Sequence, residues 1–300
     1  MMKNKNVYQW VTASLKNNDL IFIEEDGFER AIEDGFFFIK VPDDIDFIGG
    51  DLFANEFYKM KTGDIVDNYR GFHTWTSSNL APREGYFVRT DDQVEQFFLE
   101  KQFWAKVFPE ELRILAERMQ FFGLLVLESV LKSIDLPVEL WDEATGRSLS
   151  GRGAYHLTFN HFRPSVQARG LNVHKDSGWL TILRSIDPGL EVLRKGEWVP
   201  INPKADHFIV NFGCAIEILS HKMKKKVSAV SHRVTQQTEN GNTNDRFSYA
   251  LFIDSSFDET VCQGLYSYSD NNSLIKEKEL ASFIDDIVNR TYQRDGDGLY

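Results

Sequence analysis

The second half of the chain is divided into short β-rich runs, and this pattern constrains the fold more than any other feature. Turn-forming segments such as PGL, RKGE and ENGNTND separate the runs, at the intervals of roughly 8–12 residues that are typical of two-sheet proteins. Such a pattern predicts a jelly roll or a barrel. The eight runs cover residues 155–162, 179–183, 190–193, 198–201, 207–212, 216–219, 227–234 and 247–253.

The first half mixes helical and strand patterns. Residues 26–34 predict a short helix, and residues 35–41 (GFFFIKV) predict a buried strand that ends before Pro42. Apolar residues recur at spacings of three and four between 110 and 132, which indicates a long amphipathic helix. Residues 62–90 show no clear period and predict an ordered loop region, of the kind that often borders a site.

These patterns predict an α+β protein with a mainly β core, flanking N-terminal helices and a C-terminal helix over about residues 273–292. Since no flexible linker separates the halves, we expect one domain over residues 1–300. Within it, 1–150 is the helical and mixed region, 151–256 is the jelly-roll core with the site, and 257–300 is a C-terminal helical segment.

Charge and composition exclude several classes of partner. The net charge of −11 argues against nucleic acid and anionic membranes. Two cysteines cannot build a disulfide framework, and no apolar run approaches the roughly 20 residues of a membrane span. We therefore expect a soluble, cytoplasmic protein, monomeric or weakly homo-oligomeric, that acts on a small molecule.

One histidine pattern suggests metal chemistry. His174 and Asp176 alternate with Lys175, so on a strand both project from the same face. His232 lies on a later run and can complete a facial set of two imidazoles and one carboxylate. Such a set leaves adjacent coordination positions open, as non-haem Fe(II) oxygenases require. His-x-Asp alone is a weak motif, and a solvated strand edge is the alternative interpretation.

A second pair strengthens the metal hypothesis. Arg246 and Ser248 again alternate on one strand face, 14 residues beyond His232. A guanidinium and a hydroxyl can bind a buried carboxylate. A metal triad beside such a clamp suits a 2-oxo acid. The alternative for Arg246 is a surface ion pair with Asp245.

The ordered series of motifs resembles the isopenicillin N synthase-like branch of the Fe(II)/2-oxoglutarate-dependent dioxygenases. Residues 35–41, 83–87 and 108–119 are similar to that family's early strand, pre-helix segment and long helix. The matching pieces of the β region are NVHKD, LTIL, PGLEVL, GEWVPINP, IVNFG, IEILS, KKVSAVSHRV and RFSYALF.

The resemblance implies a double-stranded β-helix (jelly-roll) core and an enzyme that uses Fe(II), 2-oxoglutarate and O₂. It assigns the metal to His174, Asp176 and His232, and the far carboxylate of 2-oxoglutarate to Arg246 and Ser248. It further implies oxidation of an unactivated C–H bond of a small molecule by hydroxylation, desaturation or cyclisation, with release of succinate and CO₂. Biosynthesis of a specialised metabolite or an amino-acid derivative is the expected setting.

The chain departs from the family pattern at one functional position. The family carries an upstream Asn-x-Tyr whose hydroxyl helps to hold the co-substrate. Here Asn160 matches, but Phe162 lacks the hydroxyl, so Tyr155 or Thr158 would have to replace it. Because of this departure, an oxidase of the same fold is an alternative. It would not use 2-oxoglutarate, and Arg246 and Ser248 would bind the carboxylate of its substrate instead. A silent jelly-roll binding protein is a further alternative.

The substrate pocket is predicted from segments expected near the metal. Five arginines in such segments hint at an anionic, carboxylate-bearing substrate, although ordinary surface arginines are the alternative; they are Arg70, Arg83, Arg163, Arg169 and Arg184. The candidate pocket residues are Phe162, Trp179, His161, Arg70, His73 and Trp75.

Overall fold

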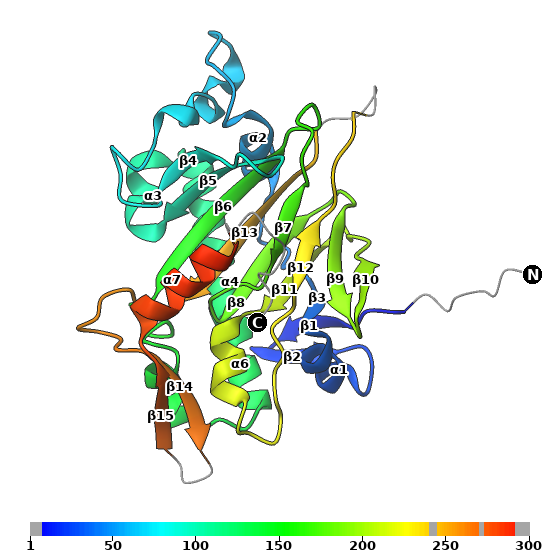
Figure 1. Cartoon of the computed structure of the whole chain (residues 1–300), viewed down its shortest axis with the longest axis vertical. Helices are drawn as coiled ribbons and strands as arrows, with labels where there is room; N and C mark the ends of the chain where they lie inside the picture. Colours follow the sequence, from blue (N-terminus) through cyan, green and yellow to red (C-terminus); the bar gives the residue numbers. More distant parts are fainter. Residues whose placement is uncertain (1–7, 240–244, 270–272, 292–300) are drawn as a thin grey trace, which may run out of the picture.

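Two β-sheets lie face to face at the centre of the protein, seen here in a computed structural model that describes residues 8–239, 245–269 and 273–291 (Figure 1). The larger sheet has the order β2 (Asp19–Phe22), β1 (Thr12–Lys16), β3 (Phe36–Lys40), β11 (His207–Phe212), β8 (Leu180–Ser185), β13 (Phe247–Asp254), β6 (Ala154–Phe162), β5 (Val94–Glu100) and β4 (Gly85–Val88). The smaller sheet has the order β10 (Glu197–Pro200), β9 (Leu190–Arg194), β12 (His232–Val234) and β7 (Leu171–His174). This arrangement confirms the predicted jelly-roll core.

The inner faces of the sheets form an apolar cluster at one end of the space between them. Phe36, Phe38 and Leu183 of the large sheet are buried in the same cluster as Val192 and Val234 of the small sheet. The strand β13 runs antiparallel to β6 on one side and to β8 on the other. The strand β13 therefore joins β6 and β8 within the large sheet.

Helices cover the outer face of the large sheet. The long helix α4 (Glu110–Ser133) packs on β13 and β8, and lies behind them in Figure 1. A Cβ at Gly123 of α4 would lie 2.8 Å from Ile253 Cδ1, so glycine permits this close approach. The other helices are α1 (Gly27–Asp34), α2 (Ile48–Glu56), α3 (Lys101–Val107), α5 (Trp141–Ala144), α6 (Cys214–Ser220) and α7 (Leu280–Thr291), with short 3₁₀ turns η1 (Ile65–Tyr69), η2 (Phe72–Thr74) and η3 (Val138–Leu140).

Phenylalanines supply much of this outer core. The fully buried Phe53 of α2 contacts five other phenylalanine rings, with centroids 4.6–5.7 Å away; the five are Phe57, Phe72, Phe97, Phe108 and Phe159. Most pairs are edge-to-face, which is the favourable arrangement of two ring quadrupoles. Many of the chain's 24 phenylalanines thus fasten helices to the sheet and do not line a site.

Two predicted elements were wrong. Residues 216–219 belong to α6, because Ile216 and Leu219 are buried three residues apart while Glu217 and Ile218 between them are partly exposed, which is a helical spacing. The predicted C-terminal helix begins only at Leu280. The residues before it form β15 (Ser273–Lys278), a mostly exposed strand paired with β14 (Leu265–Ser269).

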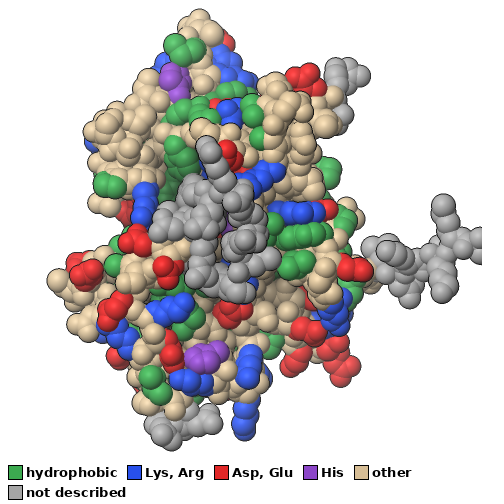
Figure 2. Space-filling model, in the orientation of Figure 1, with side chains coloured by type: hydrophobic (Ala, Val, Ile, Leu, Met, Phe, Trp, Pro, Cys, Tyr) green, Lys and Arg blue, Asp and Glu red, His purple; other side chains and the backbone are tan. Residues whose placement is uncertain are grey.

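Two observations describe the surface. Among the described residues, no helix is long and apolar enough to cross a bilayer. On the face shown in Figure 2, red acidic and blue basic side chains are interspersed. This part of the described surface therefore has no broad basic patch for a polyanion.

We expect Phe53→Ala to lower the free energy of unfolding by about 3–5 kcal/mol, the usual cost of a large cavity in a packed core. Phe121→Ala is a matched control, because Phe121 on α4 is 65% exposed; its effect should stay within about 0.5 kcal/mol. Urea denaturation measures both. Equal effects would contradict the central role of Phe53 in the outer core.

Candidate iron centre

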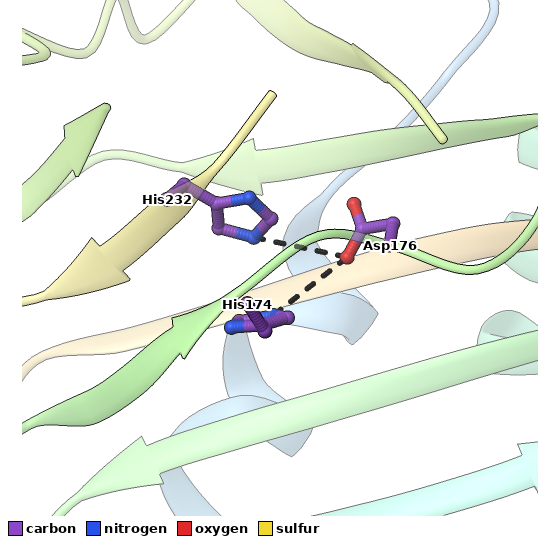
Figure 3. Close-up of side chains that lie close together, drawn as sticks. All are labelled: His174, Asp176 and His232. Carbon is purple, nitrogen blue, oxygen red and sulfur yellow. Dashed lines mark ion pairs between the residues drawn. The ribbon is translucent and has the colours of Figure 1, made fainter. Parts of the chain in front are cut away.

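The side chains of His174 and Asp176 meet that of the distant His232 between the two sheets (Figure 3). His174 ends β7, Asp176 follows two residues later, and His232 begins β12 directly opposite His174 in the strand pairing. Asp176 Oδ1 lies 3.7 Å from Nε2 of His174 and 3.7 Å from Nε2 of His232. All three candidate ligand atoms lie within 4.8 Å of one another, so one metal ion can contact them together.

Backbone carbonyls orient the two imidazoles. His174 Nδ1 lies 2.8 Å from the Asn172 carbonyl oxygen, and His232 Nδ1 lies 3.2 Å from that of Val230. An Nδ1–H that donates to a carbonyl leaves the lone pair on Nε2, the atom that faces Asp176. Both rings are thus held in the tautomer that a metal ion needs.

The carboxylate of Asp176 is divided between two tasks. Its Oδ2 accepts hydrogen bonds from Thr181 Oγ1 at 2.7 Å and from Asn211 Nδ2 at 3.3 Å. Its Oδ1 faces the histidines. The partners on β8 and β11 therefore fix the plane of the carboxylate and leave one oxygen for the metal.

The electrostatics of the site favour the unprotonated forms of His174 and Asp176. Burial, and then the neighbouring His232, lower the pKa of His174 to about 3. Burial alone would raise the pKa of Asp176, but the two histidines and the hydrogen bonds from Thr181 and Asn211 outweigh it and lower the pKa. A neutral imidazole and an ionised carboxylate are the forms that bind a cation.

The triad opens into a cavity of about 1150 Å³. Arg246 lines its far end and is only 6% exposed. Arg246 Nε donates to the Pro188 carbonyl at 3.0 Å, Nη2 donates to Ser185 Oγ at 3.2 Å, and the guanidinium lies 4.5 Å from the Phe162 ring centroid. Burial lowers the pKa of Arg246 to about 10, so the group stays charged at neutral pH.

One nitrogen of this guanidinium is left for a ligand. Arg246 Nη1 is buried and has no partner among the described residues. A buried charged donor without a partner loses its hydration and gains nothing in return. Ser248 and Asn160 line the cavity beside it. The donor set thus fits both groups that the sequence implies, a metal ion and a carboxylate.

The predicted pocket residues divide into two groups. Of the six, Phe162 lines the cavity. Trp179 is fully buried in the outer core, where Nε1 donates to Ser255 Oγ at 3.1 Å. His161 follows Asn160 on β6, so it projects from the opposite face, where it stacks on Tyr58. Trp179 and His161 were therefore misplaced by the sequence prediction.

The remaining three predicted pocket residues lie elsewhere. Arg70, His73 and Trp75 border a separate cavity beside η2 and the start of α4. Arg70 there pairs with Glu56 at 2.5 Å and Asp64 at 2.7 Å. The loop region 62–90 does reach the iron cavity, but through later residues, including Glu84 and Tyr86.

The arginines that suggested an anionic substrate are mostly bound elsewhere. Besides Arg70, Arg163 donates to backbone carbonyls, Arg169 pairs with Asp92 at 2.5 Å, and Arg184 pairs with Asp51 at 3.0 Å. Of the five, Arg83 alone is among the described residues that line the cavity. The observation that favoured a carboxylate-bearing substrate is therefore lost.

Sequence reasoning missed His156 and Asp254 in one wall of the cavity. His156 and Thr158 precede Asn160 at intervals of two on β6 and share its inward face, and Asp254 lies on the inward face of β13. Counting back from Asn160 in steps of two would have found the residues on β6. Glu84 gave no such signal, because it lies outside the strands.

Comparison with known proteins agrees with this geometry. Residues 154–255 match the model of the 2OG-Fe(II) oxygenase superfamily. Thebaine 6-O-demethylase of Papaver somniferum is 32% identical over 114 residues (36% of this chain, 29% of that protein), and a 1-aminocyclopropane-1-carboxylate oxidase of Persea americana is 29% identical over 161 residues (52% and 46%). The chain thus spans about half or less of these curated relatives.

Solved structures share the fold over most of the chain. The dioxygenase for auxin oxidation of rice has a TM-score of 0.61 at 23% identity, covering 85% of this chain and 86% of that one. The dioxygenase for auxin oxidation 1 of Arabidopsis thaliana, in its binary complex with 2-oxoglutarate, has a TM-score of 0.60 at 20% identity, covering 83% and 94%.

The fold and the site define a jelly-roll protein with a facial His-Asp-His centre. The match to the 2OG-Fe(II) oxygenase superfamily covers residues 154–255, which hold all three residues of this centre.

We expect Thr181→Val to weaken Fe(II) binding about 10- to 100-fold, the usual effect of removing a hydrogen bond that orients a metal ligand. Anaerobic metal titration measures this, and thermal melting checks the fold. Thr74→Val, at an exposed position remote from the triad, is the control. Unchanged affinity in Thr181→Val would show that Asp176 does not need this partner.

Proposed function

We propose that this protein is an Fe(II)- and 2-oxoglutarate-dependent oxygenase that oxidises an unactivated C–H bond of a small molecule, releasing succinate and CO₂. The product arises by hydroxylation, desaturation or oxidative cyclisation, in the biosynthesis of a specialised metabolite or an amino-acid derivative. The observation that carries the proposal is the unpartnered Nη1 of Arg246, buried in the same cavity as the His-Asp-His triad.

In this proposal His174, Asp176 and His232 would hold the iron. Three protein ligands would leave coordination positions for a 2-oxo acid and for O₂. Iron with 2-oxoglutarate supplies the oxidising power when bound, and the chain supplies binding, orientation and exclusion of water. The near-complete burial of Asp176 and His232 serves that exclusion.

Arg246 and Ser248 would hold the far carboxylate of 2-oxoglutarate. Pro188 and Ser185 fix the guanidinium before the ligand arrives, which lowers the entropic cost of binding. Phe162 contributes through its ring face, 4.5 Å from the guanidinium, where the family pattern has a hydroxyl. The stacking helps to hold the cation in place.

Of the two residues suggested as replacements for the missing hydroxyl, Thr158 is the better placed. Its Oγ1 is buried, lines the cavity and lacks a partner among the described residues. Tyr155 faces the outer core, where its hydroxyl donates to the Ser148 carbonyl.

An oxidase of the same fold that does not use 2-oxoglutarate is the second candidate, and Phe162 favours it. The clamp would then bind the substrate's own carboxylate.

The amount of succinate formed from 2-oxoglutarate under O₂ with Fe(II) distinguishes the two candidate functions. We expect succinate to accumulate and to increase when substrate is present. Consumption of O₂ with substrate but without succinate would overturn the main proposal.

Arg246→Lys should raise the dissociation constant of 2-oxoglutarate about tenfold or more, since a lysine has one nitrogen and cannot bond Pro188 and Ser185 while presenting a donor in the place of Nη1. Arg194→Lys is the matched control, because Arg194 pairs with Asp34 at 2.8 Å and does not line the cavity. Anaerobic calorimetry with Fe(II) present measures both. Equal affinities in the two variants would contradict the assigned role of Arg246.

A further inference from the structure

The cavity has a second end that the proposed co-substrate does not reach. Among the described residues, four buried side-chain polar atoms lack a hydrogen-bond partner, and three of the four residues line this one cavity. Arg246 Nη1 belongs to the carboxylate clamp. The other two are His156 Nδ1 and Thr158 Oγ1 on β6. A buried polar atom without a partner lowers stability, and a ligand group that bonds these two atoms would remove that cost.

Glu84 and Phe98 hold the ring of His156 in place. Its Nε2 lies 3.2 Å from Glu84 Oε1, and Oε2 of the same carboxylate accepts a hydrogen bond from the Glu100 amide. The ring stacks on Phe98, with centroids 4.3 Å apart. An Nε2–H that donates to Glu84 leaves a lone pair on Nδ1 in the neutral imidazole. Nδ1 is then an acceptor that has no donor among the described residues.

The strand register places this acceptor far from the clamp. Ser248 pairs with Asn160 at the clamp end, and Phe252 pairs with His156 four residues along, a distance of about 13 Å at the usual strand rise. Thr158 lies between them on the same face. A 2-oxoglutarate bound to Arg246 and the metal would therefore leave His156 free for the substrate.

An acid completes this end of the cavity. Asp254 is the next inward residue of β13 after Phe252, and its side chain bonds Ser177 Oγ at 3.3 Å. No described lysine or arginine lies within ion-pair distance of it. Burial raises the pKa of Asp254 to about 6, against the opposing effects of His156 and of the hydrogen bond from Ser177.

The other charged residues around the cavity also leave an excess of acidic groups. Its other basic residues are engaged: Arg83 pairs with Asp285, Arg89 with Asp92, and Lys175 with Glu217. Besides Asp176, Asp254 and the Asp285 that pairs with Arg83, the acids that line the cavity are Glu84, Glu100, Asp258 and Glu259. The end near His156 thus favours a cation over an anion.

We propose that His156 and Asp254 form the substrate subsite and bind an amino group on an apolar, ring-bearing substrate. The ammonium donates to Asp254 and to His156 Nδ1. Thr158 lies beside His156 in the row of polar residues on the inward face of β6. Phe98, Phe252 and Phe257 line the surrounding wall and accept the apolar skeleton. The inference rests on the proposed function, since it places the substrate beside the iron.

The test uses matched pairs of arylalkyl amines and carboxylates with phenyl, naphthyl and indolyl rings. Binding to the protein loaded anaerobically with Fe(II) and 2-oxoglutarate is measured by calorimetry. At least one amine should bind tenfold or more tightly than its carboxylate partner. Asp254→Asn and His156→Phe should each weaken that amine tenfold or more, while Asp206→Asn, at an exposed position outside the cavity, should not.

Affinities for Fe(II) and 2-oxoglutarate, measured on the same samples, separate this inference from the proposed function. If both cofactors bind but no amine does, if the carboxylates bind better, or if Asp254→Asn binds the amine normally, the amine subsite is wrong. If the wild type binds neither Fe(II) nor 2-oxoglutarate, the proposed function fails first. A variant that loses cofactor binding or its melting transition is replaced by Asp254→Ser or His156→Leu, and the same outcomes apply.

Discussion

The alternation of side chains along β6 and β13 is the constraint on which the rest of the structure depends. Successive residues of a strand project to opposite faces, and these two strands stand in the middle of the large sheet. Their outward residues pack in the core beneath α4, for example Leu157, Phe159 and Leu251. Their inward residues line the cavity. A register shift of one residue would exchange the two sets, so the packing of the helices also positions the site.

A second consequence concerns the cost of a polar interior. Most buried polar groups of the described chain have partners, as stable proteins require. The exceptions concentrate in the iron cavity, where Arg246, His156 and Thr158 each keep an unpartnered atom. These unpartnered atoms lower the stability of the free protein, and hydrogen bonds to a bound ligand would restore it. The carboxylate clamp and the amine subsite are thus two ends of one polar row, with the metal triad beside it.

Much of this could be predicted from the sequence, because its strongest signals are local. The spacing of strand runs predicted the jelly roll, and alternation within HKD and RFS predicted which side chains share a face. The predictions failed where tertiary contacts decide. Residues 216–219 suit a strand or a helix equally well, and burial of Ile216 with Leu219 selects the helix. Trp179 and His161 were assigned to the pocket by proximity in sequence, which says nothing of the face from which a side chain projects.

The central claim is that one cavity holds a metal-chelated 2-oxo acid whose far carboxylate rests on Arg246. Anaerobic addition of Fe(II) and 2-oxoglutarate, followed by absorption spectroscopy, tests it most directly. Chelation of the 2-oxo acid to iron produces a metal-to-ligand charge-transfer band, which we predict will saturate at one iron and one 2-oxoglutarate per chain. Binding of 2-oxoglutarate that is indifferent to iron, with no such band, would contradict the account.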